Sequence, residues 1–263
     1  MYMSELIKYP RTPHLKGSKL QPGDEDLSQI SPSKILGKYI VIEEKVDGAN
    51  TAISFDENGE LLLQNRGHYL TGGYRERHYN LFKNWAIAHQ DELFGILGTK
   101  YIMYGEWLYA KHTVYYDALP HYFLEFDIYD RESNVFLDTE KRHEMLKNSC
   151  VVSVPVLNAG VYKNIKDVLS CLGDSNYKTH DCLLNLQKEA IKQGYDLDKA
   201  LAETDNSMLM EGIYIKVEEN GIVVDRMKYV RYSFTQAISE TSTHWIDRTI
   251  IPNKLTVDIK EIF

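Results

Sequence analysis

Cysteine is scarce in this sequence, and the cysteines present follow no metal-binding pattern. There are three, Cys150, Cys171 and Cys182, among 263 residues. No C-x-x-C or H-x-x-H pair accompanies them, so neither a disulfide framework nor a structural zinc site is indicated. We therefore expect reduced thiols in a reducing compartment, and a cytoplasmic protein.

Long apolar runs and an excess of positive charge are also missing. No apolar segment approaches the length needed to cross a membrane, and the first nine residues lack the hydrophobic stretch of a signal peptide. The formal net charge is −8, so the molecule as a whole does not attract nucleic acid, and a surface for it would be a local basic patch. Hydrophobic residues make up 43% of the chain, which suits a soluble protein with one large domain.

Strands joined by tight turns alternate with groups of helices along the chain. Turn signals such as Asn58-Gly59 between apolar runs predict hairpins. We expect strands over residues 39–44, 50–55, 61–64, 101–107, 121–129, 135–137, 210–217 and 221–229. Helical spacing is found over residues 75–97, 139–146, 164–172 and 179–204. This order predicts an α+β fold in which antiparallel β-sheets are flanked by helices.

Composition divides the chain into three parts. Residues 1–34, rich in proline, glycine and charge, are expected to form an extended segment packed on the main domain, residues 35–235. Residues 236–263 are expected to form a short packed tail, with apolar residues at Trp245-Ile246 and 249–252. A surface arm is the simplest interpretation of the first segment. The alternative is that its basic residues contact phosphate: Arg11, His14, Lys16 and Lys19.

The most informative motif is Lys-Val-Asp-Gly, which begins at Lys45 and follows the apolar strand 39–44. A lysine that leaves a strand into a glycine turn suits the presentation of an amine to a nucleotide better than a place in a core. Nucleophilic attack needs the neutral amine, and hence a lowered pKa. Glu43, Glu44 and Asp47 alone would raise this pKa, so cations must come from elsewhere in the fold. An ordinary solvated lysine is the alternative.

Three further candidates lie at strand ends or on strand faces. Arg66, beside Gly67, can contact a phosphate through both guanidinium nitrogens. Glu106 can bind ribose hydroxyls or a metal. Phe126 can stack on a base, although a core position is its default interpretation. Each of these residues alone also suits an ordinary strand or turn.

The late hairpin carries the remaining charged residues. Alternation in its first strand places Glu211, Ile213 and Ile215 on one face, and Gly212, Tyr214 and Lys216 on the other. Glu211 is a candidate ligand for a hard divalent cation. In the next strand Arg226 and Lys228 share a face, so together they suit a triphosphate and are expected to depress the pKa of Lys45.

This ordered set, over roughly residues 35–235, resembles the RNA ligase 2 type of ATP-dependent polynucleotide ligases in the covalent nucleotidyltransferase superfamily. Lys45-Val46-Asp47-Gly48-Ala49-Asn50 is similar to the nucleophile motif of that family. The later family motifs are matched, in order, by Arg66, Glu106, Phe126-Asp127, Glu211-Gly212 with Lys216, and Arg226-Met227-Lys228. The resemblance implies a nucleotidyltransferase fold over residues 35–235.

The resemblance also implies a reaction and a set of roles. ATP would adenylylate Lys45, AMP would pass to the 5′-phosphate of an RNA end, and a 3′-hydroxyl would then displace it, with Mg²⁺ or Mn²⁺ as the metal. The implied catalytic residues are Lys45, Arg66, Arg226 and Lys228. The implied nucleotide-binding residues are Glu44, Lys45, Asp47, Asn50, Arg66, Glu106, Phe126, Glu211, Lys216 and Lys228. Glu211 and Glu106 are the implied metal ligands.

The sequence departs from the family pattern in two places, and alternatives stay open. Arg226 stands where the family usually has lysine. No OB domain or ligase C-terminal domain is expected after residue 235, so a partner protein is one candidate to replace it. The alternative functions are a DNA ligase-like or GTP-using nucleotidyltransferase, a non-catalytic module that binds nucleotide or RNA ends, and a structural α+β protein.

Overall fold

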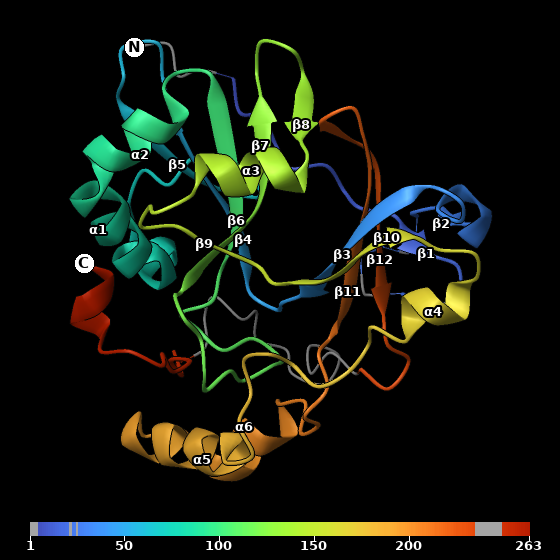
Figure 1. Cartoon of the computed structure of the whole chain (residues 1–263). Helices are drawn as coiled ribbons and strands as arrows, with labels where there is room; N and C mark the ends of the chain where they lie inside the picture. The colour runs from blue at the N-terminus through green and yellow to red at the C-terminus, as the bar shows by residue number, and fades with distance from the viewer. Residues whose placement is uncertain (1–4, 21–22, 25, 235–248) are drawn as a thin grey trace.

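A computed structural model describes residues 5–20, 23, 24, 26–234 and 249–263 of the chain (Figure 1). Its main strands form one continuous path in the order β10-β3-β11-β12-β8-β7-β6-β4-β5, and all neighbours along it are antiparallel. The strands are β3 (Tyr39–Lys45), β4 (Ala49–Phe55), β5 (Leu61–Asn65), β6 (Tyr101–Trp107), β7 (Phe123–Asp130), β8 (Val135–Leu137), β10 (Val156–Val161), β11 (Gly212–Glu219) and β12 (Ile222–Val230). The predicted α+β class with antiparallel pairing is confirmed.

The sheet has two halves that meet at the short strand β8. Figure 1 shows β4, β5, β6 and β7 on one side and β3, β10, β11 and β12 on the other. β8 pairs with β12 and with β7 at two positions each. The chain passes from one half to the other between the end of β3 at Lys45 and the start of β4 at Ala49. The Lys-Val-Asp-Gly motif is therefore one of the points at which the chain crosses between the halves.

Helices cover the outer face of the β4–β7 half. The single helix predicted over 75–97 is divided into a 3₁₀ helix (Tyr74–Tyr79), α1 (Asn80–Ala88) and α2 (Gln90–Leu97). Phe82, Trp85 and Leu93 from these helices are fully buried against the strands in one apolar core. A second core, which includes Ile42 and Ile215, belongs to the other half.

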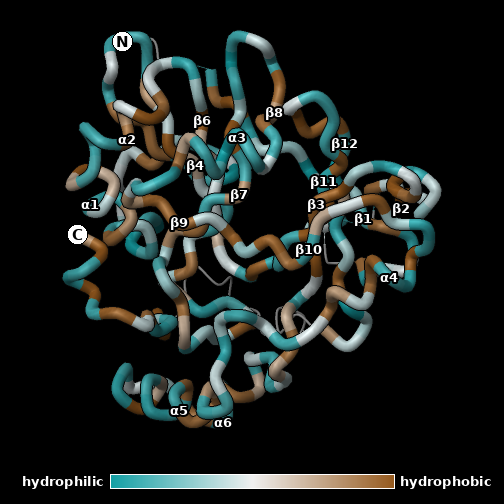
Figure 2. Tube along the Cα trace, in the orientation of Figure 1, coloured by the Kyte–Doolittle hydropathy of each residue, from teal (hydrophilic) through white to brown (hydrophobic). Residues whose placement is uncertain are grey.

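The remaining helices are shorter than the sequence pattern predicts. They are α3 (Thr139–Met145), α4 (Ile165–Leu169), α5 (Cys182–Lys192) and α6 (Leu197–Ala202). The helix expected over 179–204 is interrupted because Gly194 has a φ of +65°, which a helix cannot continue through. Hydrophobic and hydrophilic residues alternate along α5 and α6, as expected of helices with one buried face (Figure 2).

The N-terminal segment joins the sheet. Strand β1 (His14–Leu15) pairs in parallel with β12, with His14 opposite Lys228, and with β2 (Gln29–Ile30). At the other end of the chain, Ile251, Leu255 and Ile262 are buried, and a 3₁₀ helix spans Ile259–Ile262. The part of the predicted tail from 236 to 248, with Trp245-Ile246, lies outside the described residues. The three-part division of the chain stays a prediction.

Among the described residues, no helix has both the length and the apolar character required to span a bilayer. A short strand, β9 (Val152–Ser153), runs parallel to β7 and completes the described strands.

Candidate active site

A cavity of about 510 Å³ lies where the two halves of the sheet separate. This volume is in the range of small-molecule and cofactor sites. Its lining includes nine of the residues that the sequence singles out: Glu44, Lys45, Asp47, Asn50, Arg66, Glu106, Phe126, Glu211 and Lys228. Lys216 and Arg226 are not among its lining residues. The fold thus brings most of the predicted set to one place.

The turn after β3 is held rigidly. The Asp47 carboxylate accepts hydrogen bonds from the backbone N–H groups of Thr113 (2.7 Å) and Val114 (2.9 Å), and the Asp47 N–H donates to the Tyr116 hydroxyl (2.8 Å). At Gly48 a β-carbon would lie 2.6 Å from the carbonyl oxygen of Trp107, so only glycine fits between the turn and β6. These contacts fix the direction in which the chain leaves Lys45.

Lys45 is paired with a carboxylate. Its Nζ lies 2.7 Å from Glu211 Oε2, and 17% of its side chain is exposed. Burial disfavours the charged amine, but neighbouring carboxylates, with Glu211 foremost, outweigh burial and raise the pKa of Lys45. Glu106 and Asp47 act in the same direction. The expectation that cations depress this pKa is therefore wrong for the protein without nucleotide, because the nearest charges are negative.

Glu211 has a different orientation from the one predicted. We expected it to share a face with Ile213 and Ile215, which pack in the apolar core of the β3–β12 half. β11 begins at Gly212, one residue after Glu211, so strand alternation does not extend to it. Its carboxylate is buried and points to Lys45 in the cavity.

Glu106 completes a group of acidic side chains around the amine. Its Oε1 accepts a hydrogen bond from the Gly48 N–H at 3.1 Å. Burial is the main cause that raises the pKa of Glu106 to about 8, and the charges of Asp47 and Glu211 add to it, although Lys45 opposes them. Carboxylates that repel one another in a buried site are suited to a hard divalent cation. The donor set therefore fits the magnesium or manganese ion expected from the sequence.

Glu44 is held by a loop. It is buried, and its oxygens accept hydrogen bonds from Ser175, from the Asn176 N–H at 3.0 Å and from the Asn176 side-chain amide at 2.7 Å. Burial raises its pKa although these hydrogen bonds oppose the rise. The predicted nucleotide contact of Glu44 thus competes with contacts that already occupy its carboxylate.

Aromatic and hydroxyl side chains form another part of the cavity wall. Phe126 lines it, and the Tyr9 ring meets Phe126 edge-on, with centroids 5.0 Å apart. Thr12 and Tyr214 line the same cavity and hydrogen-bond to each other. Sequence reasoning missed Tyr9, Thr12 and Tyr214 as wall residues. For Tyr214 the one signal in the sequence was the strand alternation that places it on the same face as Lys216.

The other two polar candidates, Asn50 and Arg66, come from the paired strands β4 and β5, where the neighbouring Thr51 is opposite Asn65. Arg66, just after β5, is exposed at the cavity. Asn50 on β4 pairs with Glu106 on β6 in the sheet register, so both side chains are brought to the cavity from neighbouring strands.

Lys216 and Arg226 belong to a buried ion-pair network. Lys216 has no exposed side-chain surface, and its Nζ lies 2.8 Å from Glu43 Oε2 and 3.3 Å from Asp127 Oδ1. It also donates a hydrogen bond to the Phe126 carbonyl. Arg226 Nη2 lies 3.8 Å from Asp127 Oδ2. Carboxylates from β3 and β7 thus pair with both cations inside the protein, and the nucleotide contacts expected of Lys216 and Arg226 stay predictions.

The same network joins the two halves of the sheet through a residue that the sequence did not reveal. Arg142 on α3 is fully buried and lies 2.6 Å from Glu43 of β3 and 2.7 Å from Glu125 of β7. Burial opposes the charge of Arg142, but these carboxylates outweigh it and raise its pKa. In the sequence Arg142 is one charged residue in a short helix, and nothing local indicates its long-range partners.

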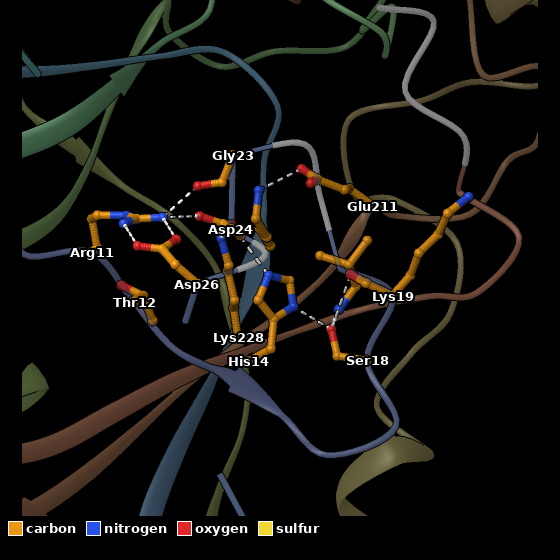
Figure 3. A network of polar contacts seen from close by, with 12 residues as sticks. Arg11, Thr12, His14, Ser18, Lys19, Gly23, Asp24, Asp26, Glu211 and Lys228 are labelled. Atoms are coloured by element: carbon orange, nitrogen blue, oxygen red, sulfur yellow. Dashed lines mark hydrogen bonds and ion pairs between the residues drawn. The ribbon is translucent and has the colours of Figure 1, made fainter. Parts of the chain in front are cut away.

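Among the predicted cations of the late hairpin, Lys228 is the one that lines the cavity. Burial and the nearby charge of Lys45 lower the pKa of Lys228, and the ion pair that it forms with Asp24 opposes them. Figure 3 shows Lys228 directed toward Asp24 and His14 of the N-terminal segment. Of the two cations predicted to act together on a triphosphate, Lys228 alone is directed to the cavity.

Comparisons with known proteins bear on the family and the fold of this chain. The family model described as RNA ligase matches residues 38–230. A Naegleria gruberi RNA ligase solved with PPi is 15% identical, with a TM-score of 0.54, over 88% of this chain and 62% of that chain. An archaeal ATP-dependent RNA ligase is 16% identical, with a TM-score of 0.51, over 85% of this chain and 48% of that one. A search of curated proteins gave no significant match.

At 15–16% identity the solved structures show a shared fold, a sheet of antiparallel strands with helices beside it. The chain also spans only about half to three fifths of the length of those ligases. The family model matches well over half of the chain and includes the nine strands of the main path, from β3 to β12 in the sequence. This chain therefore belongs to the RNA ligase family.

Proposed function

We propose that this protein is an ATP-dependent RNA ligase that forms a lysyl-AMP intermediate at Lys45. The observation that carries the proposal is the position of Lys45. It lies at the end of β3, in a nucleotide-sized cavity, between the carboxylates of Glu106 and Glu211 and close to Lys228. Family membership supports the reaction class, since the matched segment begins before β3 and ends with β12.

In the first step the adenine of ATP lies against Phe126, and Lys45 Nζ attacks the α-phosphorus. A nitrogen–phosphorus bond forms, the bond from the α-phosphorus to the bridging oxygen breaks, and pyrophosphate leaves. The amine must lose a proton for this attack. Glu211 Oε2 accepts a hydrogen bond from the ammonium at 2.7 Å and favours its protonated form, so in this proposal the proton leaves to solvent once that ion pair is loosened. Lys228 supports the negative charge that develops on the phosphoryl oxygens.

A divalent cation fits the acidic side of the cavity. Glu106 and Glu211 would hold Mg²⁺ or Mn²⁺, which when bound offsets phosphate charge and loosens the ion pair that keeps Lys45 protonated. The hydrogen bond from the Gly48 N–H to the Glu106 carboxylate holds the turn after Lys45 against β6 on this side of the cavity.

The later steps use RNA ends. The 5′-phosphate of one end attacks the lysyl-AMP, and AMP moves to that phosphate. The 3′-hydroxyl of the other end then displaces AMP, and a phosphodiester bond forms. Arg66, exposed at the cavity, is placed to contact the RNA phosphate. The partner protein and the cytoplasmic location expected from the sequence stay predictions.

The decisive test is covalent labelling. Incubation with α-³²P-ATP and Mg²⁺ is expected to label the wild-type protein, and Lys45→Ala to abolish the label. Lys188→Ala, at an exposed position on α5, is the matched control and should label normally. Stable ATP binding without label or pyrophosphate release would instead indicate a non-catalytic binding module. Sealing of matched RNA and DNA nicks, and a parallel assay with GTP, separate the RNA ligase from the DNA- and GTP-using alternatives.

A further inference from the structure

A histidine, a carboxylate and a thiol meet at the helices that cover the β4–β7 half. They are His89, between α1 and α2, Glu92 in the first turn of α2, and Cys150, in the segment between α3 and β9. One donor atom of each, a ring nitrogen, a carboxylate oxygen and Sγ, lies within 4.8 Å of the other two. The residues that line the cavity at Lys45 do not include these three. The cluster is therefore separate from the proposed adenylylation site.

A hydrogen bond to the end of the chain fixes the orientation of the His89 ring. Its Nε2 lies 3.1 Å from the carbonyl oxygen of Ile262, in the C-terminal 3₁₀ helix that Figure 1 shows near α1. A carbonyl oxygen only accepts hydrogen bonds, so Nε2 carries the ring proton. The neutral ring therefore turns the lone pair of Nδ1 toward Glu92 Oε2, which is 3.5 Å away. Metal-bound histidines are held in this way, with the other ring nitrogen bonded to a carbonyl or a carboxylate.

The Glu92 carboxylate is oriented by the backbone. Its Oε1 accepts a hydrogen bond from the Cys150 N–H at 2.8 Å, which leaves Oε2 as the oxygen that faces His89. His89 and Glu92 are three residues apart, a spacing that brings two side chains together on one side of a helix. Cys150, in contrast, is 58 residues from Glu92 in the sequence. Local spacing therefore did not reveal this group.

The two facing atoms are both acceptors when the imidazole is neutral. Nδ1 and Oε2 then have no proton between them, and they repel each other unless a cation joins them. Cys150 adds a sulfur to the same place. Burial and the Glu92 carboxylate raise the pKa of this thiol to about 12, so Sγ keeps its proton until a metal displaces it. A second proton on His89 is the alternative to a metal ion, and the test separates the two.

The types of donor atom select the metal. Zn²⁺ binds thiolate sulfur, imidazole nitrogen and carboxylate oxygen, whereas Mg²⁺ prefers oxygen ligands alone. Donor atoms around a tetrahedral Zn²⁺ lie about 3.5 Å apart, and the distance between His89 Nδ1 and Glu92 Oε2 already has this value. Sγ would need to approach by roughly 1 Å to reach the same spacing. The side chains of Glu92 and His89 are 41% and 19% exposed, so water can reach a fourth position.

We propose that His89, Glu92 and Cys150 form a binding site for Zn²⁺, with a water molecule as the fourth ligand. The metal bonds to Nδ1, Oε2 and Sγ, and the thiol proton passes to solvent as the zinc–sulfur bond forms. Zn²⁺ would then join the junction of α1 and α2 to the segment before β9 and, through the His89 ring, to the C-terminal 3₁₀ helix. The proposal does not depend on the ligase reaction.

Zinc binding by the metal-free full chain tests the proposal. Isothermal titration calorimetry with Zn²⁺, in an excess of Mg²⁺ that occupies sites made of oxygen alone, is expected to show one tight site per chain. A change in a residue that only orients a metal ligand costs roughly 10–100-fold in affinity, so Cys150→Ser and Glu92→Gln should each cost at least as much. Cys171→Ser is the matched control and should bind Zn²⁺ like wild type. Cys171 is also half-buried, but it packs on the apolar core of the β3–β12 half.

A cobalt spectrum identifies the ligands without any substitution. Co²⁺ at this site should give a charge-transfer band from the thiolate and the visible bands of a four-coordinate ion, and Zn²⁺ should remove both. Co²⁺ binding without the thiolate band would overturn the proposal, as would equal Zn²⁺ affinity of wild type and Cys150→Ser. A wild-type protein that binds no Zn²⁺ would also overturn it, and would leave His89 as a protonated partner of Glu92.

Thermal unfolding and adenylylation complete the test. With Zn²⁺ at about 100 times its Kd, the Tm of the wild type should rise by roughly 5–10 °C, and that of Cys150→Ser should not change. An unchanged Tm of the wild type would contradict the proposal. Cys150→Ser should still take the AMP label at Lys45. A protein that binds Zn²⁺ as expected but takes no label defeats the ligase proposal alone, and one that labels but binds no Zn²⁺ defeats the zinc site alone.

Discussion

Replacement of Lys216 by methionine tests whether this lysine stabilises the fold or binds nucleotide. The side chain is fully buried, and it neutralises Glu43 at 2.8 Å and Asp127 at 3.3 Å. Methionine keeps much of the volume and removes the charge. Removal of one partner from a buried ion pair costs about 3–5 kcal/mol, because a charge is left uncompensated in a medium of low polarity. Glu43 keeps Arg142 at 2.6 Å, so the unmatched charge falls mainly on Asp127.

We therefore expect Lys216→Met to lower the free energy of unfolding by about 3–5 kcal/mol. For a chain of this size that corresponds to a fall in Tm of roughly 6–20 °C. Urea unfolding followed by tryptophan fluorescence measures it, since Trp85 and Trp107 are buried in the core. Lys188→Met, at an exposed helix position, is the matched control and should change stability by less than about 0.5 kcal/mol.

Two results would refute this reasoning. A loss of less than about 1 kcal/mol would show that the ion pairs contribute little beyond a surface pair. A variant of normal stability that no longer binds ATP would restore the nucleotide-binding role implied by the sequence. The double variant with Asp127→Asn adds a further check, because directly coupled residues should show a non-additivity of about 0.5–3 kcal/mol.

Three other outcomes are expected. Gly48→Ala should destabilise the fold by about 1–3 kcal/mol in urea, since its β-carbon meets the Trp107 carbonyl, whereas Gly95→Ala, with open space in α2, should not destabilise it. Burial opposes the charge of Asp127, but Lys216 and other cations outweigh it and lower its pKa. Asp127→Asn should therefore lower the free energy of unfolding by its full amount above about pH 4. The difference from wild type should shrink at lower pH, as acid protonates the wild-type carboxylate, and a difference that is unchanged at pH 2–3 would contradict this assignment. Phe126→Ala should raise the KM for ATP roughly tenfold through lost stacking, and Phe126→Tyr should not; equal KM values would exclude the ring from the adenine site.

Local pattern was sufficient for the reactive turn and for the eight strands that it predicted, but it missed β10 of the main sheet and the two-residue strands β1, β2 and β9. Alternating apolar residues and turn dipeptides identify the hairpins, because strand period and turn conformation depend on neighbours in sequence. Local pattern also identifies the turn, because Lys45 ends a strand and Gly48 allows the backbone to approach the neighbouring strand closely. The predicted helix ends were less accurate than the predicted strands. α1 ends at Ala88 and α2 begins at Gln90, and the helix expected over 179–204 is interrupted at Gly194, whose φ of +65° a helix cannot continue through.

The contacts of the charged residues depend on partners that are distant in the sequence. Lys216 and Lys228 have similar surroundings in sequence, both on strands of the late hairpin. Lys216 pairs with carboxylates of β3 and β7, whereas Lys228 lines the cavity and pairs with Asp24 of the N-terminal segment. No local signal separates the two, since their partners lie about 90 to 200 residues away in the chain.

The sequence by itself determined the fold class, the crossing turn at Lys45 and the membership of the chain in a ligase-like group, because these depend on periodicity and on the order of short motifs. Only the tertiary structure decided the charge state of Lys45, the burial of Lys216 and Arg226, and the pairing of Lys228 with Asp24. The physical reason is that a charge interacts through space with whatever the fold brings within a few ångströms. Which groups those are is set by the pairing of strands that are distant in sequence.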